Sequence, residues 1–380
     1  MRRRHIRPQC TDVDEWKHDT PVAPIKQAMV IHMSLSDSTC AVPCRYRDGM
    51  RSFPRLDAAV SASERDRQCL WTRRSNGLKS LRRRVGDGSL IEVRPGLFVR
   101  SAYWDALGHR ERIMHVLRTV TSKHPHWVLG GISAAAVWGL NETYVMHEHV
   151  HVMIDGHART RDRGIYRFHH AANVTGEMRD GVLVTSLIRT VFDCIRTLPF
   201  PEALAICDAA MRDHRLDPDE LRRFIDDHPG YKGVRRARMV LSYADSRSEN
   251  GGESIARAWF IVWGFAVPLL QHELCDPMTG RSRRVDYLWR LDDGRFVVGE
   301  LDGREKYANP AMLGGGDAID AVLAEKERES GIQLAYPRAV FVRFSFRQLM
   351  EQPGIVRRKL DAAGVPRVSD GLDEGMMRWL

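Results

Sequence analysis

Three carboxylate residues, Asp286, Glu300 and Asp302, lie within "RVDYLWRLDDGRFVVGELDGREKY" (residues 284–307), which otherwise alternates like two short strands. Carboxylates are uncommon inside strands, and each one needs a partner if it is buried. Carboxylates gathered on one face repel each other, so either one keeps its proton at neutral pH or a divalent cation offsets the repulsion. Mg²⁺ suits this set because it binds one or two carboxylates together with water and substrate phosphate.

The turn "DDG" (292–294) decides which of these side chains face one another. In a three-residue loop, Gly294 takes the left-handed position that such loops prefer. Asp286 then faces Glu300 directly, with Cβ atoms about 4.5–5.5 Å apart, and Asp302 shares the face of Glu300. A two-residue loop would shift the register by one residue and separate them. The glycine favours the three-residue loop.

Glu253, on a predicted helix 33 residues before Asp286, adds a possible fourth oxygen donor. Glu253, Asp286 and Glu300 are therefore the predicted ligands of a metal site, with Mg²⁺ or Mn²⁺ as the ion. The alternative is a solvated edge hairpin with an acidic outer face. Phe296 and Val298 share the face of Glu300, which argues against a simply polar surface.

A basic segment lies between Arg73 and Arg100, where eight Lys or Arg residues stand against Asp87 and Glu92. The segment predicts a helix from Ser75, a "GDGS" turn and two short strands at 90–93 and 97–100, which is the order of a winged helix-turn-helix. Such a helix enters the major groove and its basic face meets phosphates. The alternative is a solvated basic face. The predicted DNA-binding residues are Arg73, Arg74, Ser75, Asn76, Lys79, Arg82, Arg83, Arg84 and Arg94.

Three histidines, His147, His149 and His151, alternate along one face of the predicted strand "HVHVMID". This spacing is compatible with a metal site. It also occurs on a solvated strand face, and no carboxylate or cysteine stands at a matching spacing. We therefore expect a solvated face here.

Composition places the chain among globular proteins, with 43% hydrophobic and 8% aromatic residues over 380 positions. That length predicts two or three domains. The net charge of +9 favours an anionic partner, of which nucleic acid is the commonest. Seven cysteines, odd in number and irregularly spaced, argue against a disulfide framework. The basic N-terminus lacks a secretory apolar segment and no apolar run could span a bilayer, so we expect a cytoplasmic protein without a membrane partner.

The pattern along the chain predicts an α+β or α/β multidomain protein. Residues 1–55 show no apolar periodicity, so we expect disorder there, and Met29, Met33 and Met50 are alternative starts. Residues 101–245 form a mixed α/β domain, with a helix over 105–122, a short buried helix in "LGGISAAAVWGL", two neighbouring strands in "HVHVMID" and "RGIYRFHH", and a helical run from "TSLIRTVFDCIRTL" capped by Thr185 or Ser186. Residues 246–380 read as α-β-β-β-α-β, with the last helix over 317–330.

This last order, together with "VDYLW" and "VVGELDG", resembles the PD-(D/E)XK nuclease fold, and most closely its branch similar to very-short-patch repair endonucleases. Residues 65–245 resemble the AbiEi-type antitoxin architecture through "LRRRVGDGSLIEVRPGLFV", "SAAAVWGL" and "VTSLIRTVFD". The resemblance implies a winged helix-turn-helix at 56–100, an AbiEi-like domain at 101–245 and a restriction-endonuclease-like domain at 246–380.

The nuclease resemblance implies that Asp286 and Glu300 are the principal metal ligands and Glu253 the helix acid of a magnesium-dependent endonuclease. Asp302 stands where that pattern expects a lysine. Lys306, or Lys326 on the following helix, could supply the missing amine. The antitoxin resemblance implies a DNA-binding transcription regulator, and a nucleotidyltransferase toxin as its partner. A non-catalytic repressor with a degenerate nuclease domain is the alternative function.

Overall fold

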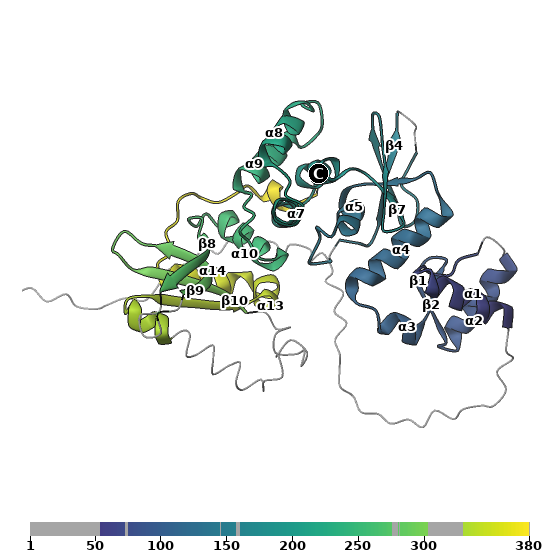
Figure 1. The fold of residues 1–380 in the computed structure, drawn as a ribbon, viewed down its shortest axis with the longest axis horizontal. Coiled ribbons are helices and arrows are strands. Elements are labelled where there is room, and N and C mark those ends of the chain that lie inside the picture. Colours follow the sequence, from purple (N-terminus) through teal and green to yellow (C-terminus); the bar gives the residue numbers. More distant parts are fainter. Residues whose placement is uncertain are drawn as a thin grey trace, which may run out of the picture. The chain divides into compact units, whose positions relative to one another are not determined.

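The N-terminal part of the computed structural model consists of two helices and a hairpin (Figure 1). Helix α1 (Pro54–Arg65) is followed by α2 (Ser75–Gly86), β1 (Leu90–Arg94) and β2 (Leu97–Arg100). The predicted helix and both predicted strands are thus confirmed. A small core fills the space between them, in which Val60 and Leu81 of the helices pack with Leu90 and Phe98 of the strands.

The structure describes residues 54–379, except 73–74, 145, 157–159, 276–279, 281 and 303–329. Residues 1–53 of the segment expected to be disordered and residues 317–329 of the helix expected over 317–330 lie outside these residues, whereas Pro54 begins α1. Within them, no helix combines the length and the apolar character needed to cross a bilayer. The four cysteines with a described state are all free thiols.

A five-stranded mixed sheet forms the first half of the middle region, in the order β5-β4-β3-β7-β6. β4 and β5 pair in parallel, as do β3 and β7, and the other two pairs are antiparallel. The predicted pairing of "HVHVMID" with "RGIYRFHH" is confirmed. The strands are β3 (Val128–Leu129), β4 (Val150–Asp155), β5 (Tyr166–Ala171), β6 (Glu177–Arg179) and β7 (Val182–Val184).

Helices pack on this sheet and beside it. The helix predicted over 105–122 corresponds to α4, which begins only at His109 because Gly108 is its N-cap, and the short α3 precedes it. The short buried helix predicted in "LGGISAAAVWGL" is confirmed as α5. These helices are α3 (Ser101–Asp105), α4 (His109–Lys123), α5 (Gly131–Trp138), α6 (Leu187–Thr197), α7 (Phe200–Asp213), α8 (Pro218–Asp226) and α9 (Val234–Tyr243).

The C-terminal region is a four-stranded sheet, in the order β11-β10-β9-β8, with helices against it. β10 and β11 pair in parallel, and the other two pairs are antiparallel. The predicted first helix and four strands are confirmed, whereas two short helices after the last strand were not predicted. The elements are α10 (Gly251–Val262), β8 (Leu269–Cys275), β9 (Ser282–Arg290), β10 (Phe296–Asp302), β11 (Val340–Ser345), α13 (Phe346–Glu351), α14 (Pro353–Ala363) and η2 (Glu374–Met377).

Helix α10 belongs to two cores at once. Its residues Ala258 and Ile261 pack into the large core of α6, α7 and α9, while Phe260 packs against Tyr287 and the C-terminal sheet. The small side chains of α7 allow this close packing. A buried ion pair joins the same two helices, with Arg257 Nη2 2.6 Å from Asp208 Oδ2.

Candidate functional site

The acidic hairpin has the predicted register. Gly294 has φ of +80° in the loop 292–294, and the backbone N–H of Leu291 donates to the carbonyl of Arg295. Strands β9 and β10 then pair from Phe296↔Arg290 to Gly299↔Tyr287. One further residue along this register places Asp286 opposite Glu300, as the sequence predicted.

Asp286 is half-buried and turned towards the backbone of β10. Its Oδ2 accepts a hydrogen bond of 2.9 Å from the backbone N–H of Leu301, one residue beyond Glu300. Glu300 is buried at the same end of the strand. The two predicted principal ligands thus lie together on neighbouring strands.

Glu253 belongs to the start of α10, where it forms a capping box with Asn250. Its backbone N–H donates to Asn250 Oδ1, and its own carboxylate accepts from Asn250 Nδ2, from the Glu249 N–H and from Gln271 Nε2 at 2.7–2.9 Å. Burial, reinforced by the charge of Asp286, raises the pKa of Glu253 to about 7. Glu253 is therefore close to Asp286, and both its oxygens already accept hydrogen bonds.

Gln271 is a member of this cluster that the sequence analysis missed. It lies on β8 between the pairs Leu270↔Tyr287 and His272↔Val285, which places it opposite Asp286. Its φ of +50° is unusual for a non-glycine residue inside a strand and marks local backbone strain. Gln271 differs from the other residues of β8 in this positive φ, and nothing in the sequence indicates that conformation.

Asp302 lies in the position where a nuclease of the resembling family would have lysine. Its Oδ1 is 3.6 Å from Arg343 Nη1 on the parallel neighbour β11, so an arginine neutralises it. Lys306 and Lys326, the two proposed substitutes for that lysine, lie outside the described residues. Among the residues that the structure describes, Arg343 is therefore the basic residue paired with Asp302.

The described residues contain no group of three or more His, Cys, Asp or Glu side chains arranged to hold a metal ion. Both oxygens of Glu253 accept hydrogen bonds, and Asp286 and Glu300 lie on the neighbouring strands β9 and β10. Two carboxylates are sufficient for Mg²⁺, which completes its coordination with water and substrate phosphate. The donor set fits a two-carboxylate magnesium site, and does not fit the three-ligand site that the sequence predicted.

Helix α2 carries six of the nine predicted DNA-binding residues, and its four basic residues fall into two groups. Lys79, Arg82 and Arg83 are exposed, and the side chain of Arg82 remains 59% accessible although its Nε is 3.6 Å from Glu92. Arg84 is 17% accessible and pairs with Asp57 of α1 at 2.6 Å. Phosphate contacts require accessible cations, so Lys79, Arg82 and Arg83 fit a role in binding DNA better than Arg84 does.

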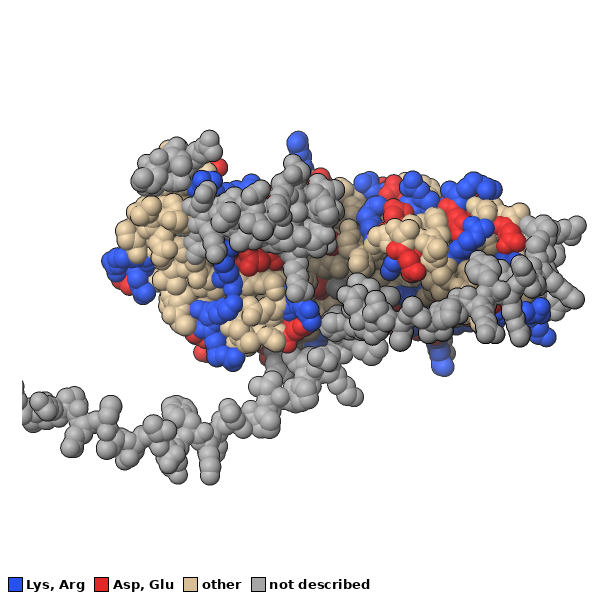
Figure 2. Space-filling view, turned by 90° about the horizontal axis from the view of Figure 1, so that it is seen from below, with Lys and Arg blue, Asp and Glu red and all other residues tan. Residues whose placement is uncertain are grey.

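The remaining predicted DNA-binding residues contribute less to this face. Arg94 donates to the carbonyls of Val93 and His147 at 2.9 and 3.1 Å, which directs its guanidinium towards the protein. Arg73 and Arg74, and the side chains of Ser75 and Asn76, lie outside the described residues. On the face of the molecule in Figure 2, basic and acidic side chains stand next to one another over much of the described surface.

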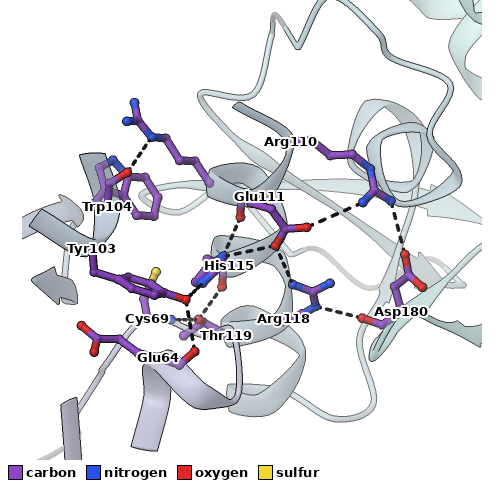
Figure 3. Close-up of polar contacts among 11 residues, drawn as sticks. Glu64, Cys69, Tyr103, Trp104, Arg110, Glu111, His115, Arg118, Thr119 and Asp180 are labelled. Carbon is purple, nitrogen blue, oxygen red and sulfur yellow. Dashed lines mark hydrogen bonds and ion pairs between the residues drawn. The ribbon is translucent and has the colours of Figure 1, made fainter. Parts of the chain in front are cut away.

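A buried polar cluster attaches this N-terminal unit to α4 (Figure 3). His115, fully buried, has Nδ1 2.6 Å from the Glu111 carbonyl and Nε2 2.9 Å from Tyr103 Oη, and that hydroxyl is also 3.1 Å from the Glu64 carbonyl. Burial lowers the pKa of His115. The Cys69 N–H donates to Thr119 Oγ1 at 2.7 Å beside it. These contacts fix α1 and α3 on α4, and so orient the α2 face.

The three alternating histidines are not on a solvated face, so that expectation was wrong. β4 begins only at Val150, and His151 is buried, with Nδ1 2.8 Å from His169 Nε2 on β5. Its ring is nearly parallel to those of His169 and Trp379, whose centres lie 4.9 and 5.6 Å away. Burial, with the neighbouring histidines contributing, lowers the pKa of His151 to about 3. The aromatic residue that covers this site comes from the far end of the chain.

Two proteins of Mycobacterium tuberculosis are similar to this chain, and no protein-family model matches it. They are the uncharacterized proteins MT2308 of strain CDC 1551 / Oshkosh and Rv2248 of strain ATCC 25618 / H37Rv. Each is 30% identical over 229 residues, which cover 60% of this chain and 79% of the relative.

Proposed function

The chain belongs to the family of the uncharacterized mycobacterial proteins MT2308 and Rv2248, and we propose that it is a DNA-binding protein whose C-terminal sheet carries a Mg²⁺-dependent endonuclease centre. The observation that carries the DNA-binding half is the exposed basic face of α2, with Lys79, Arg82 and Arg83, beside the β1–β2 hairpin. A helix followed by a hairpin is how winged helix-turn-helix proteins approach a groove.

Binding to DNA is tested by fluorescence anisotropy with duplexes from the region upstream of the gene, over a range of salt. We expect Lys79→Gln/Arg82→Gln/Arg83→Gln to weaken binding and to reduce the salt slope by about 2 to 3, since each lost phosphate contact removes about 0.9. Arg222→Gln/Arg223→Gln on α8 removes exposed charge elsewhere and is the matched control. An equal loss in both variants would show that α2 is not the contact.

The nuclease half of the proposal rests on Asp286 and Glu300. A bound Mg²⁺ supplies charge neutralisation and a more acidic water molecule at the scissile phosphate. Asp286 is oriented by the Leu301 N–H. The pKa of Glu253 is about 7, so its carboxyl group gains or loses a proton near neutral pH. The charge of Glu253 and the charge of Asp286 act on each other. Gln271 holds Glu253 in place.

Cleavage is tested with supercoiled plasmid, single-stranded DNA and mismatched duplexes, in the presence of Mg²⁺ or Mn²⁺. We expect nicking that Asp286→Asn and Glu300→Gln abolish and that Asp293→Asn preserves, because Asp293 lies exposed in the turn of the same hairpin. Isothermal titration of Mn²⁺ into the wild type and Asp286→Ala tests the ion site without a substrate. If neither cleavage nor ion binding is observed, the endonuclease half of the proposal is wrong.

The second candidate is a non-catalytic repressor or antitoxin with a degenerate nuclease domain. The contact between Asp302 and Arg343 favours it, because an arginine-neutralised aspartate stands where the resembling nucleases keep their lysine. This protein would repress its own promoter and could bind a nucleotidyltransferase toxin. DNA binding through α2 without any cleavage would favour the non-catalytic repressor over the endonuclease.

A further inference from the structure

A cavity lies in the middle region of the described residues, far from the acidic hairpin in sequence. It has a volume of about 230 Å³ and opens between the end of β4, the β5–β6 connection, the start of α6 and the end of α8. The stretch "VTSLIRTVFD" (184–193) supplies Thr185, Ser186 and Arg189 to its wall. Neither half of the proposed function uses these residues.

Arg189 is the main charged group of this wall. Its Nε donates to Asp193 Oδ2 at 2.7 Å, four residues on, and its side chain is only 15% accessible. Its Nη2 is buried and has no hydrogen-bond partner among the described residues. A buried guanidinium N–H without an acceptor costs free energy, which an anionic ligand would recover.

Asp193 does not neutralise this region completely. The same carboxylate accepts from Arg196, whose Nε and Nη2 lie 2.9 and 2.7 Å from Oδ1. One carboxylate is therefore shared by two guanidinium groups, and a net positive charge remains beside the cavity. Asp193 also fixes the rotamer of Arg189, so the cation is preorganised.

Polar side chains from three other positions meet Arg189 at the cavity. Ser186 is the N-cap residue of α6, yet its hydroxyl makes no capping hydrogen bond. His228 has Nδ1 2.7 Å from the Phe224 carbonyl, so Nδ1 carries the proton and Nε2 is left for another partner. Thr175 adds a hydroxyl, while Met153 and Phe224 form the apolar part of the wall. The donors of the wall are therefore the guanidinium of Arg189 and the hydroxyl groups, while Nε2 of His228 is an acceptor.

We propose that this cavity binds a small phosphate monoester, with the phosphoryl group held by Arg189 and Ser186. A planar guanidinium matches phosphate oxygens in pairs, and the free N–H groups at the start of α6 favour the same charge. The volume is below the roughly 300 Å³ at which pockets for larger ligands begin. A phosphoryl group with one small sugar is thus the class of ligand, and a dinucleotide is too large.

Binding is tested by isothermal titration of inorganic phosphate, ribose 5-phosphate and unphosphorylated ribose into the full chain. We expect ribose 5-phosphate to bind more tightly than phosphate, and ribose not to bind. Arg189→Gln should weaken binding at least about tenfold and Ser186→Ala about threefold. Arg222→Gln, an exposed arginine of the neighbouring α8, should leave binding unchanged.

Thermal unfolding of each variant separates loss of binding from loss of fold. If Arg189→Gln unfolds, Arg189→Lys keeps the charge without the planar guanidinium and should bind more weakly than the wild type. Absence of binding by the wild type up to about 10 mM ligand, or equal binding by all variants, would overturn the proposal. The measurement uses neither DNA nor a divalent ion, so its outcome is independent of the proposed function.

Discussion

At the scale of single residues, Glu202 is the buried carboxyl with the simplest surroundings. It lies in the first turn of α7, and Thr143 Oγ1 donates to its Oε2 at 3.2 Å. Burial raises the pKa of Glu202 to about 7. The folded protein therefore keeps a proton on Glu202 at a pH where the unfolded chain has lost it.

This shift makes the stability of the protein depend on pH in a defined direction. Because the folded pKa is above the unfolded value near 4.5, the cost of Glu202 grows as the pH rises from about 4.5 to 7 and is then constant. We expect Glu202→Gln to raise the free energy of unfolding by up to about 3 kcal/mol above pH 7 and to have no such effect near pH 4. Urea unfolding at several pH values measures this, with the exposed Glu220→Gln of α8 as control. A gain that did not vary with pH would contradict the assignment.

Individual contacts were less predictable from the sequence than the elements that carry them. Arg84 was expected to face DNA, but Asp57, 27 residues away, pairs with it. Gln271 entered the acidic cluster through a backbone conformation that no local pattern indicates. The partner of Arg84 and the position of Gln271 both depend on which distant residue fills the adjacent space. The type of the residue alone does not determine its neighbour.

At the scale of elements, the β9–β10 hairpin shows why register was predictable. Gly294 has φ of +80° and no atom within 4 Å of the place where a Cβ would stand, so its requirement is purely conformational. One glycine in "DDG" was therefore enough to place Asp286 opposite Glu300. The burial of His151 was not predictable in this way, because it depends on residues from β5 and from the end of the chain.

The turn itself gives a test of that argument. We expect Gly294→Val to destabilise the protein by about 1–2 kcal/mol, since β-branched residues tolerate positive φ poorly, and Gly294→Asn to cost less than half as much. Chemical denaturation of both variants measures the difference. Equal costs would mean that the turn does not depend on the left-handed conformation.

The ion pair between Asp208 of α7 and Arg257 of α10 is a second element-scale feature. Both side chains are essentially inaccessible, and burial raises the pKa of Asp208 despite the arginine. We expect Arg257→Met alone to cost about 3–5 kcal/mol, because it leaves an uncompensated buried carboxylate. Asp208→Asn/Arg257→Met should recover part of this loss. A double-mutant cycle in urea provides the measurement, and simple additivity would show that the two groups do not interact.

At the scale of the whole molecule, the predicted boundary between residues 245 and 246 follows the sequence pattern but not the packing. The polar stretch "SRSENGGES" (246–254) follows this boundary, yet α10 places Ala258 and Ile261 in the core of the region before it. The apolar residues of α10 point in more than one direction, and a sequence does not show which neighbour each face will meet. The pattern of apolar residues along the chain predicted the mixed α and β content, since secondary structure depends on local periodicity.

The C-terminal segment gives a prediction at this scale. Arg236 of α9 donates to the backbone carbonyls of Gly375 and Arg378, and Leu372 and Met376 pack on the same core. We expect removal of residues 372–380 to lower the thermal unfolding midpoint by several degrees, at about 2–4 °C per kcal/mol. Arg236→Gln should give a smaller decrease. Differential scanning calorimetry measures both, and an unchanged midpoint would show that this segment is not part of the fold.

The same contact constrains the order in which the protein can be completed during synthesis. Arg236 and Arg378 are 142 residues apart, and Trp379, whose ring centre lies 5.6 Å from that of His151, is made long after that histidine. Middle-region helices that leave the ribosome early must therefore wait, with part of their apolar surface uncovered, until residues 372–379 have been made. A truncation just before residue 372 would act on a region encoded long before it.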